Sequence, residues 1–162
     1  LIFMGYNLSA WRKTKGIISD QSKIKFYYGN KQLDYILNKS DIIICTLPST
    51  KETINLINMS RLKHFKRGSY LINIGRGNTI NERDLLIALE KEILAGAILD
   101  VFNDEPLPFT SKLWSSSKVI LTPHIGGLTQ ASKENARLII DNCNRANMKA
   151  DLLSEVNIDK GY

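Results

Sequence analysis

Short apolar runs alternate with segments of helical periodicity along most of this chain, and this alternation limits its fold more than any other feature. The runs predict buried strands, because they are apolar throughout and too short to form helices. They cover residues 7–11, 24–28, 42–47, 69–74, 97–101 and 119–121. Apolar residues at helical spacing predict helices at 31–37, 51–62, 82–91 and 130–150. Strands that alternate with helices through short connections are typical of an α/β fold with a doubly wound parallel sheet.

The predicted helix at 82–91 has the clearest start signal in the sequence. Asn81 precedes it and belongs to the residue types preferred at helix N-caps. Glu82 and Asp84 add negative charge to the first turn, where the helix dipole favours it. We therefore expect this helix to begin at Glu82.

Charge and cysteine content exclude several classes of function. Lysine and arginine exceed aspartate and glutamate by 22 to 16, but the charges are scattered and the densest cluster, 11–15, is short. Without zinc spacing, an RNA-binding aromatic motif or a long basic run, an anionic small molecule is a better expected partner than nucleic acid, and no metal site is expected. Cys45 and Cys143 lie far apart, which favours reduced thiols in a cytoplasmic protein. No apolar run approaches the length of a membrane span, so we expect a soluble protein.

Chemically active side chains follow three neighbouring predicted strands, where ligands bind in such folds. The segments are 73–77, 100–108 and 122–127. They bring together the guanidinium of Arg76, the carboxylates of Asp104 and Glu105, and the imidazole of His124, a set that can bind a carboxylate and transfer a proton. Each residue also has a purely structural interpretation: Arg76 as a loop cap, the carboxylates as solvated turn residues, His124 as a hydrogen-bonded histidine beside a proline.

The order of these motifs resembles the D-isomer-specific 2-hydroxyacid dehydrogenases. That family has an arginine after an asparagine-containing strand, an acidic Glu-Pro-Leu-Pro turn and a Pro-His-Ile-Gly motif, as here in 73–76, 104–108 and 123–126. The resemblance extends through 45–53 and 66–68 to the ending at 160–162, and so covers essentially the whole chain. Formate and phosphoglycerate dehydrogenases share much of the pattern, but the turn at Trp11, together with Trp114 and that ending, favours the glyoxylate and hydroxypyruvate reductase branch.

This resemblance implies NAD(P)H-dependent reduction of a small 2-oxo acid to the 2-hydroxy acid. His124 would protonate the carbonyl oxygen, with Glu105 hydrogen-bonded behind it, because a carboxylate beside an imidazole favours the protonated ring. Arg76 would bind the substrate carboxylate with its planar fork. Trp114 would line the substrate pocket or simply pack beside leucine. His64, the only other histidine, matches no catalytic position and is interpreted as a surface residue of a helix.

The resemblance also implies where the cofactor lies. Enzymes that use NAD place a carboxylate after the strand that here ends near Trp11, whereas Arg12, Lys13 and Thr14 occupy that turn, which favours NADP over NAD. Asp100 would face the nicotinamide and accept hydrogen bonds from its carboxamide. The remaining expected cofactor contacts are Leu47, Pro48, Thr53, Ile74, Gly75, Gly126 and Gly127.

The expected organisation is a Rossmann-like NAD(P)-binding domain truncated at its amino terminus. Residues 1–127 would form this partial domain, without a first strand or a GxGxxG loop, since Gly5 stands alone. Residues 128–162 would form a helix and tail that return to an absent substrate domain. In the strand order 3-2-1-4-5-6 the first strand is central, so its absence would leave two open edges.

Three further expectations follow from the resemblance. The chain by itself would turn over no substrate, although an enzyme containing it would, and such an enzyme would be a homodimer. The alternatives are a catalytically inactive fragment and a dinucleotide-sensing scaffold with the same fold. Retention of Arg76, Glu105 and His124 argues against the scaffold.

Overall fold

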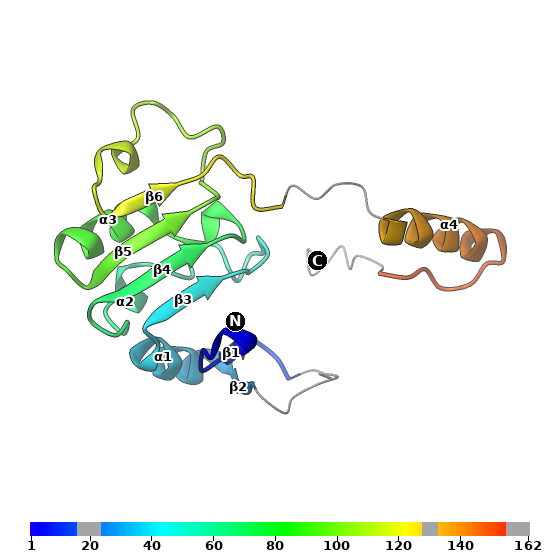
Figure 1. The fold of residues 1–162 in the computed structure, drawn as a ribbon, viewed down its shortest axis with the longest axis horizontal. Coiled ribbons are helices and arrows are strands. Elements are labelled where there is room, and N and C mark those ends of the chain that lie inside the picture. Colours follow the sequence, from blue (N-terminus) through cyan, green and yellow to red (C-terminus); the bar gives the residue numbers. More distant parts are fainter. Residues whose placement is uncertain (16–23, 128–132, 155–162) are drawn as a thin grey trace.

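The computed structural model describes residues 1–15, 24–127 and 133–154, and parallel strands form its body (Figure 1). One sheet pairs β1 (Ser9–Arg12) with β2 (Lys25–Tyr28). A second sheet has the order β3 (Ile42–Cys45), β4 (Ser69–Asn73), β5 (Leu94–Leu99) and β6 (Val119–Leu121). Every pair of neighbouring strands is parallel, which confirms the predicted α/β fold.

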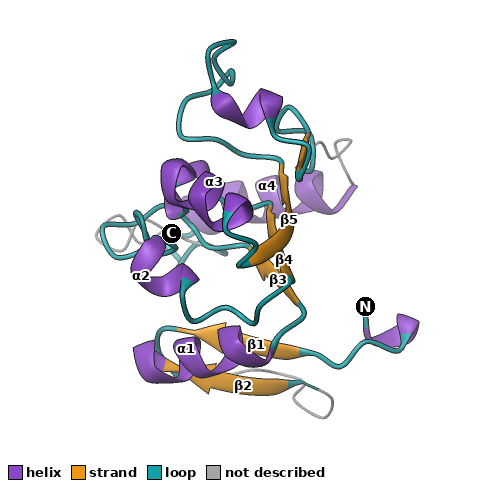
Figure 2. Cartoon of the chain, turned by 90° about the vertical axis from the view of Figure 1, so that its left-hand side faces the viewer, coloured by secondary structure: helices purple, strands orange, loops and turns teal. Residues whose placement is uncertain are grey.

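Helices cover one face of the second sheet (Figure 2). They are α2 (Met59–Leu62) and α3 (Glu82–Glu90), while α1 (Gly29–Lys39) packs on β1 and β2. Leu62, Leu71, Leu85 and Leu94 are fully buried in the core that results, and each such side chain contributes about 1.5–3 kcal/mol. The predicted start of α3 is confirmed, because the Asn81 side chain accepts a hydrogen bond from the Asp84 amide at 3.0 Å.

The other face of the second sheet is apolar and exposed. Tyr70 and Leu71 are neighbours on β4, so their side chains point to opposite faces, and only Leu71 is buried. Ile42, Ile44, Tyr70 and Ile120 are between 39% and 62% exposed. This face therefore has no cover within the described part of the chain.

The two sheets do not join. Among the described strands, β1 pairs only with β2, and β3 pairs only with β4 on its inner side. Residues of β1, β3 and α1 line a cavity of about 230 Å³ between the two open edges. Among the described residues, the facing edges of β1 and β3 are thus unpaired.

Two predicted elements were wrong in extent. Residues 51–62 do not form one helix: 51–55 form a turn, Ile57 makes a parallel bridge with Ile80, and only Met59–Leu62 is helical. Asn55 has a left-handed φ of 51°, which interrupts a helix. The strand predicted at 97–101 begins earlier, at Leu94, because Glu92 with φ 55° ends α3 and starts the strand at once. His64 is exposed as expected, but it lies in the turn after α2 and not on a helix.

The short helices and α4 complete the described structure. The 3₁₀ helices are η1 (Ile2–Met4), η2 (Gly77–Thr79) and η3 (Lys112–Ser115). The predicted helix at 130–150 corresponds to α4 (Lys133–Asn147), and residues 130–132 and 160–162 lie outside the described residues. Asn142 exchanges two hydrogen bonds with the backbone of Leu153, at 3.0 and 2.7 Å. None of the described helices is long and apolar enough to cross a membrane.

Candidate active site and cofactor cleft

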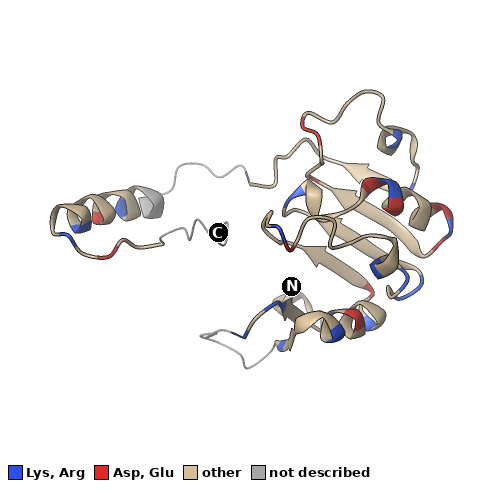
Figure 3. Ribbon diagram, turned by 180° about the vertical axis from the view of Figure 1, so that it is seen from behind, with Lys and Arg blue, Asp and Glu red and all other residues tan. Residues whose placement is uncertain are grey.

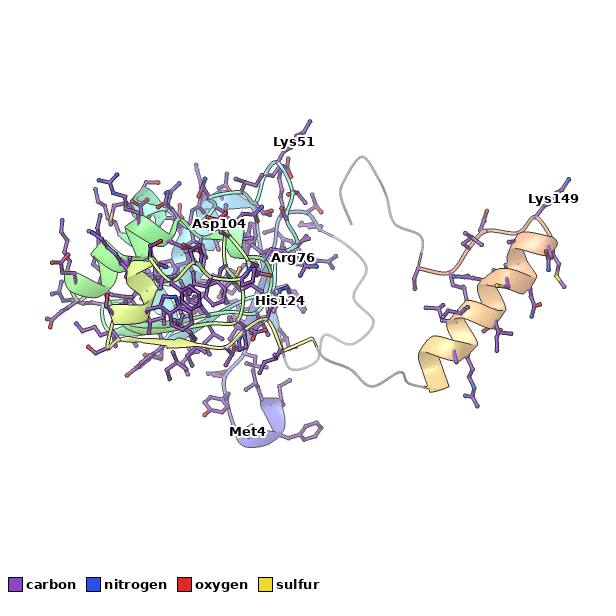
Figure 4. The ribbon with its side chains drawn as sticks, turned by 90° about the horizontal axis from the view of Figure 1, so that it is seen from above. Met4, Lys51, Arg76, Asp104, His124 and Lys149 are labelled. Atoms are coloured by element: carbon purple, nitrogen blue, oxygen red, sulfur yellow. The ribbon has the colours of Figure 1, made fainter. Side chains whose placement is uncertain are left out.

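The carboxyl ends of β4, β5 and β6 lie in register at one edge of the sheet. Asn73 is paired with Leu99, and Leu99 is paired with Leu121. The loops that follow these three residues carry Arg76, Glu105 and His124, respectively. Figure 4 labels Arg76, Asp104 and His124 on the body of the molecule, away from α4. The structure therefore brings together the strand-end residues that the sequence singled out.

His124 and Glu105 form the centre of this site. The imidazole Nδ1 lies 2.6 Å from Glu105 Oε2, and the other carboxylate oxygen, Oε1, accepts a hydrogen bond from the Phe102 amide at 2.9 Å. The hydrogen bond from His124 lowers the pKa of Glu105, with a further contribution from the Phe102 amide. Glu105 is thus a carboxylate at neutral pH. Because Nδ1 faces Glu105, Nε2 is the ring nitrogen that can face a substrate, and the side chain is 44% exposed.

Asp100 anchors the loop that carries His124. Its side chain is buried and accepts hydrogen bonds from the Thr122 hydroxyl at 2.5 Å, the Ile125 amide at 3.0 Å and the Gly126 amide at 2.8 Å. The Thr122 hydrogen bond is the largest cause of a lowered Asp100 pKa, followed among the lowering causes by the Gly126 and Ile125 amides, while burial opposes it. These bonds hold His124 at its positive φ of 52°. Both Asp100 oxygens are used in this way, and its contact with a nicotinamide stays a prediction.

Arg76 lies on a loop that packs tightly against its neighbours. A Cβ on Gly77 would lie 1.9 Å from the Phe102 backbone, and a Cβ on Gly75 would lie 2.7 Å from the Leu47 carbonyl oxygen. Only glycine fits at either position. Arg76 itself is exposed and close enough to Glu105 to contribute to its lowered pKa. Its guanidinium can therefore bind an anion next to the His124–Glu105 pair.

A cleft of about 730 Å³ extends from Arg76 to the end of β1. Its volume falls in the range of small-molecule sites. The residues predicted from sequence that line it are Arg12, Lys13, Thr14, Leu47, Pro48, Thr53, Ile74, Gly75 and Arg76. Asp100, Glu105, His124, Gly126 and Gly127 are not part of its lining. Trp114 also lies outside it, more than half exposed, with its indole donating to the Pro108 carbonyl at 3.0 Å.

The basic end of this cleft contains residues that sequence reasoning missed. Lys13 forms an ion pair with Glu52, and both side chains are more than half exposed. Arg61 lines the cleft and lies 3.1 Å from Asp34 of α1. Over the ribbon as a whole, basic and acidic positions are interspersed (Figure 3). The sequence did not assign Glu52 or Arg61 to the cleft, because both reach it through tertiary packing.

The cleft offers residues that could hold a dinucleotide. The cleft combines cations at the β1 end with apolar side chains and a tight glycine at the Arg76 end, which fits an anionic, partly aromatic ligand. Trp11 helps to shape the β1 end, since its indole donates to the Gly29 carbonyl at 2.9 Å. Within the described residues, no group of three or more His, Cys, Asp or Glu side chains could hold a metal ion.

Comparison with known proteins gives consistent relatives. Residues 3–126 match the model of the D-isomer specific 2-hydroxyacid dehydrogenase NAD binding domain. The chain is 39% identical over 129 residues to glyoxylate/hydroxypyruvate reductase A of Citrobacter koseri, covering 80% of this chain and 40% of that protein. It is 34% identical over 158 residues to the Escherichia fergusonii reductase of the same name, covering 98% and 49%. The chain thus spans half or less of the length of these curated relatives.

Solved structures agree with these sequence relatives. A D-isomer specific 2-hydroxyacid dehydrogenase from Xanthobacter autotrophicus Py2, in complex with NADPH and MES, superposes with a TM-score of 0.90 at 34% identity. The match covers 98% of this chain and 64% of that one. An NADPH-dependent glyoxylate/hydroxypyruvate reductase from Sinorhizobium meliloti, in complex with NADP and sulfate, gives 0.87 at 28% identity, covering 99% and 51%.

Proposed function

This chain belongs to the D-isomer specific 2-hydroxyacid dehydrogenase family through its NAD binding domain, and from that premise we propose that it supplies the side chains for NAD(P)H-dependent reduction of a small 2-oxo acid. The substrate is of the glyoxylate or hydroxypyruvate type, and the product is the corresponding 2-hydroxy acid. The observation that carries the proposal is the 2.6 Å contact of His124 with Glu105 beside the exposed Arg76. Such a set combines a proton donor with a carboxylate-binding fork.

Each of the three residues has a distinct role in this reaction. Arg76 binds the substrate carboxylate and polarises the carbonyl. His124 donates a proton from Nε2 to the carbonyl oxygen as negative charge develops there. Glu105, ionised and bonded to Nδ1, orients the ring so that Nε2 can face the substrate. A bound reduced nicotinamide would supply the hydride.

The cofactor we propose is NADP in preference to NAD. Arg12 and Lys13 lie at the β1 end of the cleft, where they can pair with a 2′-phosphate, and Thr14 lies beside them. Glu52 competes for Lys13, so the phosphate has to displace an existing ion pair. Leu47, Pro48, Thr53, Ile74 and Gly75 line the rest of the dinucleotide site. Asp100, at the end of β5, and Gly126 and Gly127, on the His124 loop, lie outside the cleft lining and are proposed to contact the nicotinamide end.

We also propose that the 162-residue chain alone turns over no substrate. The facing edges of β1 and β3, unpaired among the described residues, support this, because each backbone hydrogen bond that an edge leaves unmade is worth about 0.5–1.5 kcal/mol. An inactive fragment is therefore the second candidate. In the cell the protein is a cytoplasmic homodimer without nucleic-acid or membrane partners. The exposed apolar face of the second sheet supports self-association.

The test compares two proteins for loss of NADPH absorbance with glyoxylate or hydroxypyruvate. One is the chain alone, and the other is a chimaera in which the chain replaces the aligned part of the Escherichia fergusonii reductase. We expect turnover only by the chimaera. A folded chimaera that binds NADPH but reduces neither acid would refute the proposed reaction, and turnover by the chain alone would refute its proposed inactivity.

A further inference from the structure

Two buried polar side chains have no part in the chemistry proposed above. Asn73, at the end of β4, is 1% exposed, and Thr79, at the end of η2, is 0% exposed. Burial of a polar side chain costs free energy unless the side chain is hydrogen-bonded, so the hydrogen-bond partners of Asn73 and Thr79 indicate what these residues do.

Both side chains bind the backbone of Arg76. The Arg76 carbonyl oxygen accepts hydrogen bonds from Asn73 Nδ2 at 3.1 Å, from the Thr79 hydroxyl at 2.7 Å and from the Thr79 amide at 3.2 Å. On the other side of Arg76, the Gly75 amide donates to Asn73 Oδ1 at 3.1 Å. The Asn73 side chain therefore binds both the Ile74–Gly75 peptide group and the Arg76–Gly77 peptide group, one on each side of Arg76.

The same two residues connect Arg76 to the rest of the site. Cys45 of β3 lies with its Sγ 3.5 Å from the Thr79 hydroxyl. The backbone carbonyl of Asn73 accepts a hydrogen bond from the Asp100 amide at 3.0 Å. Because Asp100 anchors the His124 loop, Asn73 is the residue from which both the Arg76 loop and the His124 loop are positioned.

We propose that Asn73 and Thr79 are positioning residues that hold Arg76 at the place where it binds the carboxylate of a 2-oxo acid. This inference rests on the function proposed for Arg76. A positioning residue differs in this from an ordinary core residue. Replacement of a core residue lowers stability but leaves the relative affinities for different ligands unchanged.

The test uses two substitutions of Thr79, one that removes the hydroxyl and one that retains it. Thr79→Val keeps the size and the amide of Thr79 but removes the hydroxyl that binds Arg76, whereas Thr79→Ser retains it. Ser69→Ala is the control, since Ser69 is a buried residue of β4, the strand that ends at Asn73, and its hydroxyl has no hydrogen-bond partner in the described structure. Oxalate is the probe for carboxylate binding, NADPH is the probe for the cleft, and the thermal midpoint reports stability.

We expect Thr79→Val to weaken oxalate binding by roughly 10- to 100-fold, because small misplacements of a binding group have effects of this size. NADPH affinity stays unchanged, Thr79→Ser binds oxalate like the unmodified chain, and so does Ser69→Ala. If Thr79→Val unfolds, Asn73→Asp is measured instead, as it keeps the acceptor for Gly75 and loses the donor to Arg76.

Three results would overturn the proposal, and they differ in what else they overturn. Equal oxalate affinity in Thr79→Val and the unmodified chain leaves the proposed function intact and removes the positioning role. Parallel losses of oxalate affinity, NADPH affinity and thermal midpoint assign these residues to the core alone. No oxalate binding by the unmodified chain refutes the role of Arg76 itself, and the positioning role falls with it.

Discussion

The loops after β4, β5 and β6 and the edge formed by β1 and β3 are built in different ways. In the loops, side chains bind backbone: Asp100 holds the His124 loop, and Glu105 holds both His124 and Phe102. At the edge, β1 and β3 face a cavity of about 230 Å³ with one side of each strand unpaired among the described residues. The side chains of the acid-base site are therefore positioned by hydrogen bonds within residues 73–126. The cofactor end of the cleft depends instead on β1 and β3, which do not pair with each other.

Substitution of His124 tests the loop side of this comparison and has the largest expected effect. In the active chimaera, His124→Asn removes the proton donor and lowers kcat by roughly 10²- to 10⁴-fold. NADPH affinity stays the same, because His124 does not line the cleft. His64→Asn is the control, because His64 is exposed in a turn after α2. Steady-state kinetics measure kcat in both variants, and an equal decrease in the two would contradict the role of His124 as proton donor.

Substitution of Arg76 tests whether the loop side binds the substrate. Arg76→Lys keeps the positive charge but loses the planar fork, so we expect about a 10- to 100-fold weaker oxalate affinity. Arg67→Lys, at an exposed turn outside the cleft, is the control. Isothermal titration that gives the same oxalate affinity for Arg76→Lys as for the control would exclude bidentate binding.

Substitution of Asp100 tests how firmly the His124 loop is anchored. Asp100→Asn preserves the shape but loses a charged acceptor for the Gly126 amide, which lowers the free energy of unfolding by about 1.5–3 kcal/mol. Urea unfolding measures this difference, and Asp151→Asn, on an exposed segment, should change it far less. A loss no greater than in Asp151→Asn would mean that the loop needs no anchor.

The same carboxylates predict how stability depends on pH. The pKa values of Asp100 and Glu105 are lowered from ordinary values of 3.8 and 4.5, so the unfolded chain takes up these protons first as pH falls. Their contribution is therefore present above these values and is lost as pH falls through the lower pKa values of the folded state. The stability difference between the unmodified chain and Glu105→Gln should shrink between neutral pH and pH values below 4.5, and a constant difference would contradict the lowered pKa.

Substitution of Glu52 tests the cofactor end and has the smallest expected effect. Glu52→Gln releases Lys13 from an exposed ion pair, and such pairs are weak, so NADPH affinity should rise only about two- to fivefold. NADH affinity should not change, because NADH has no 2′-phosphate. Fluorescence titration at low and high salt measures the two affinities. An equal increase in affinity for NADPH and NADH would mean that the 2′-phosphate does not bind at Lys13.

The sequence predicted what depends on local signals. The strand at 119–121 and the start of α3 at Glu82 follow from an apolar run and from the Asn81 cap. The segment 51–62 was mispredicted because Ile57 pairs with Ile80, a contact that helical periodicity does not report. The positions of Arg76, Glu105 and His124 were accessible through motif order. The Lys13–Glu52 pair and the anchoring by Asp100 were not, because each joins residues distant in sequence.

The most direct test of this contrast is an NMR titration of the purified 162-residue chain, first with oxalate and then with NADPH. If the loops are assembled independently of the cofactor end, oxalate alone shifts the signals of Arg76 and the His124 ring, while Arg12 and Lys13 respond only when NADPH is added. If Arg76 and His124 do not respond to oxalate, or respond only after NADPH has bound, the loops are not an independent binding unit and the account is wrong.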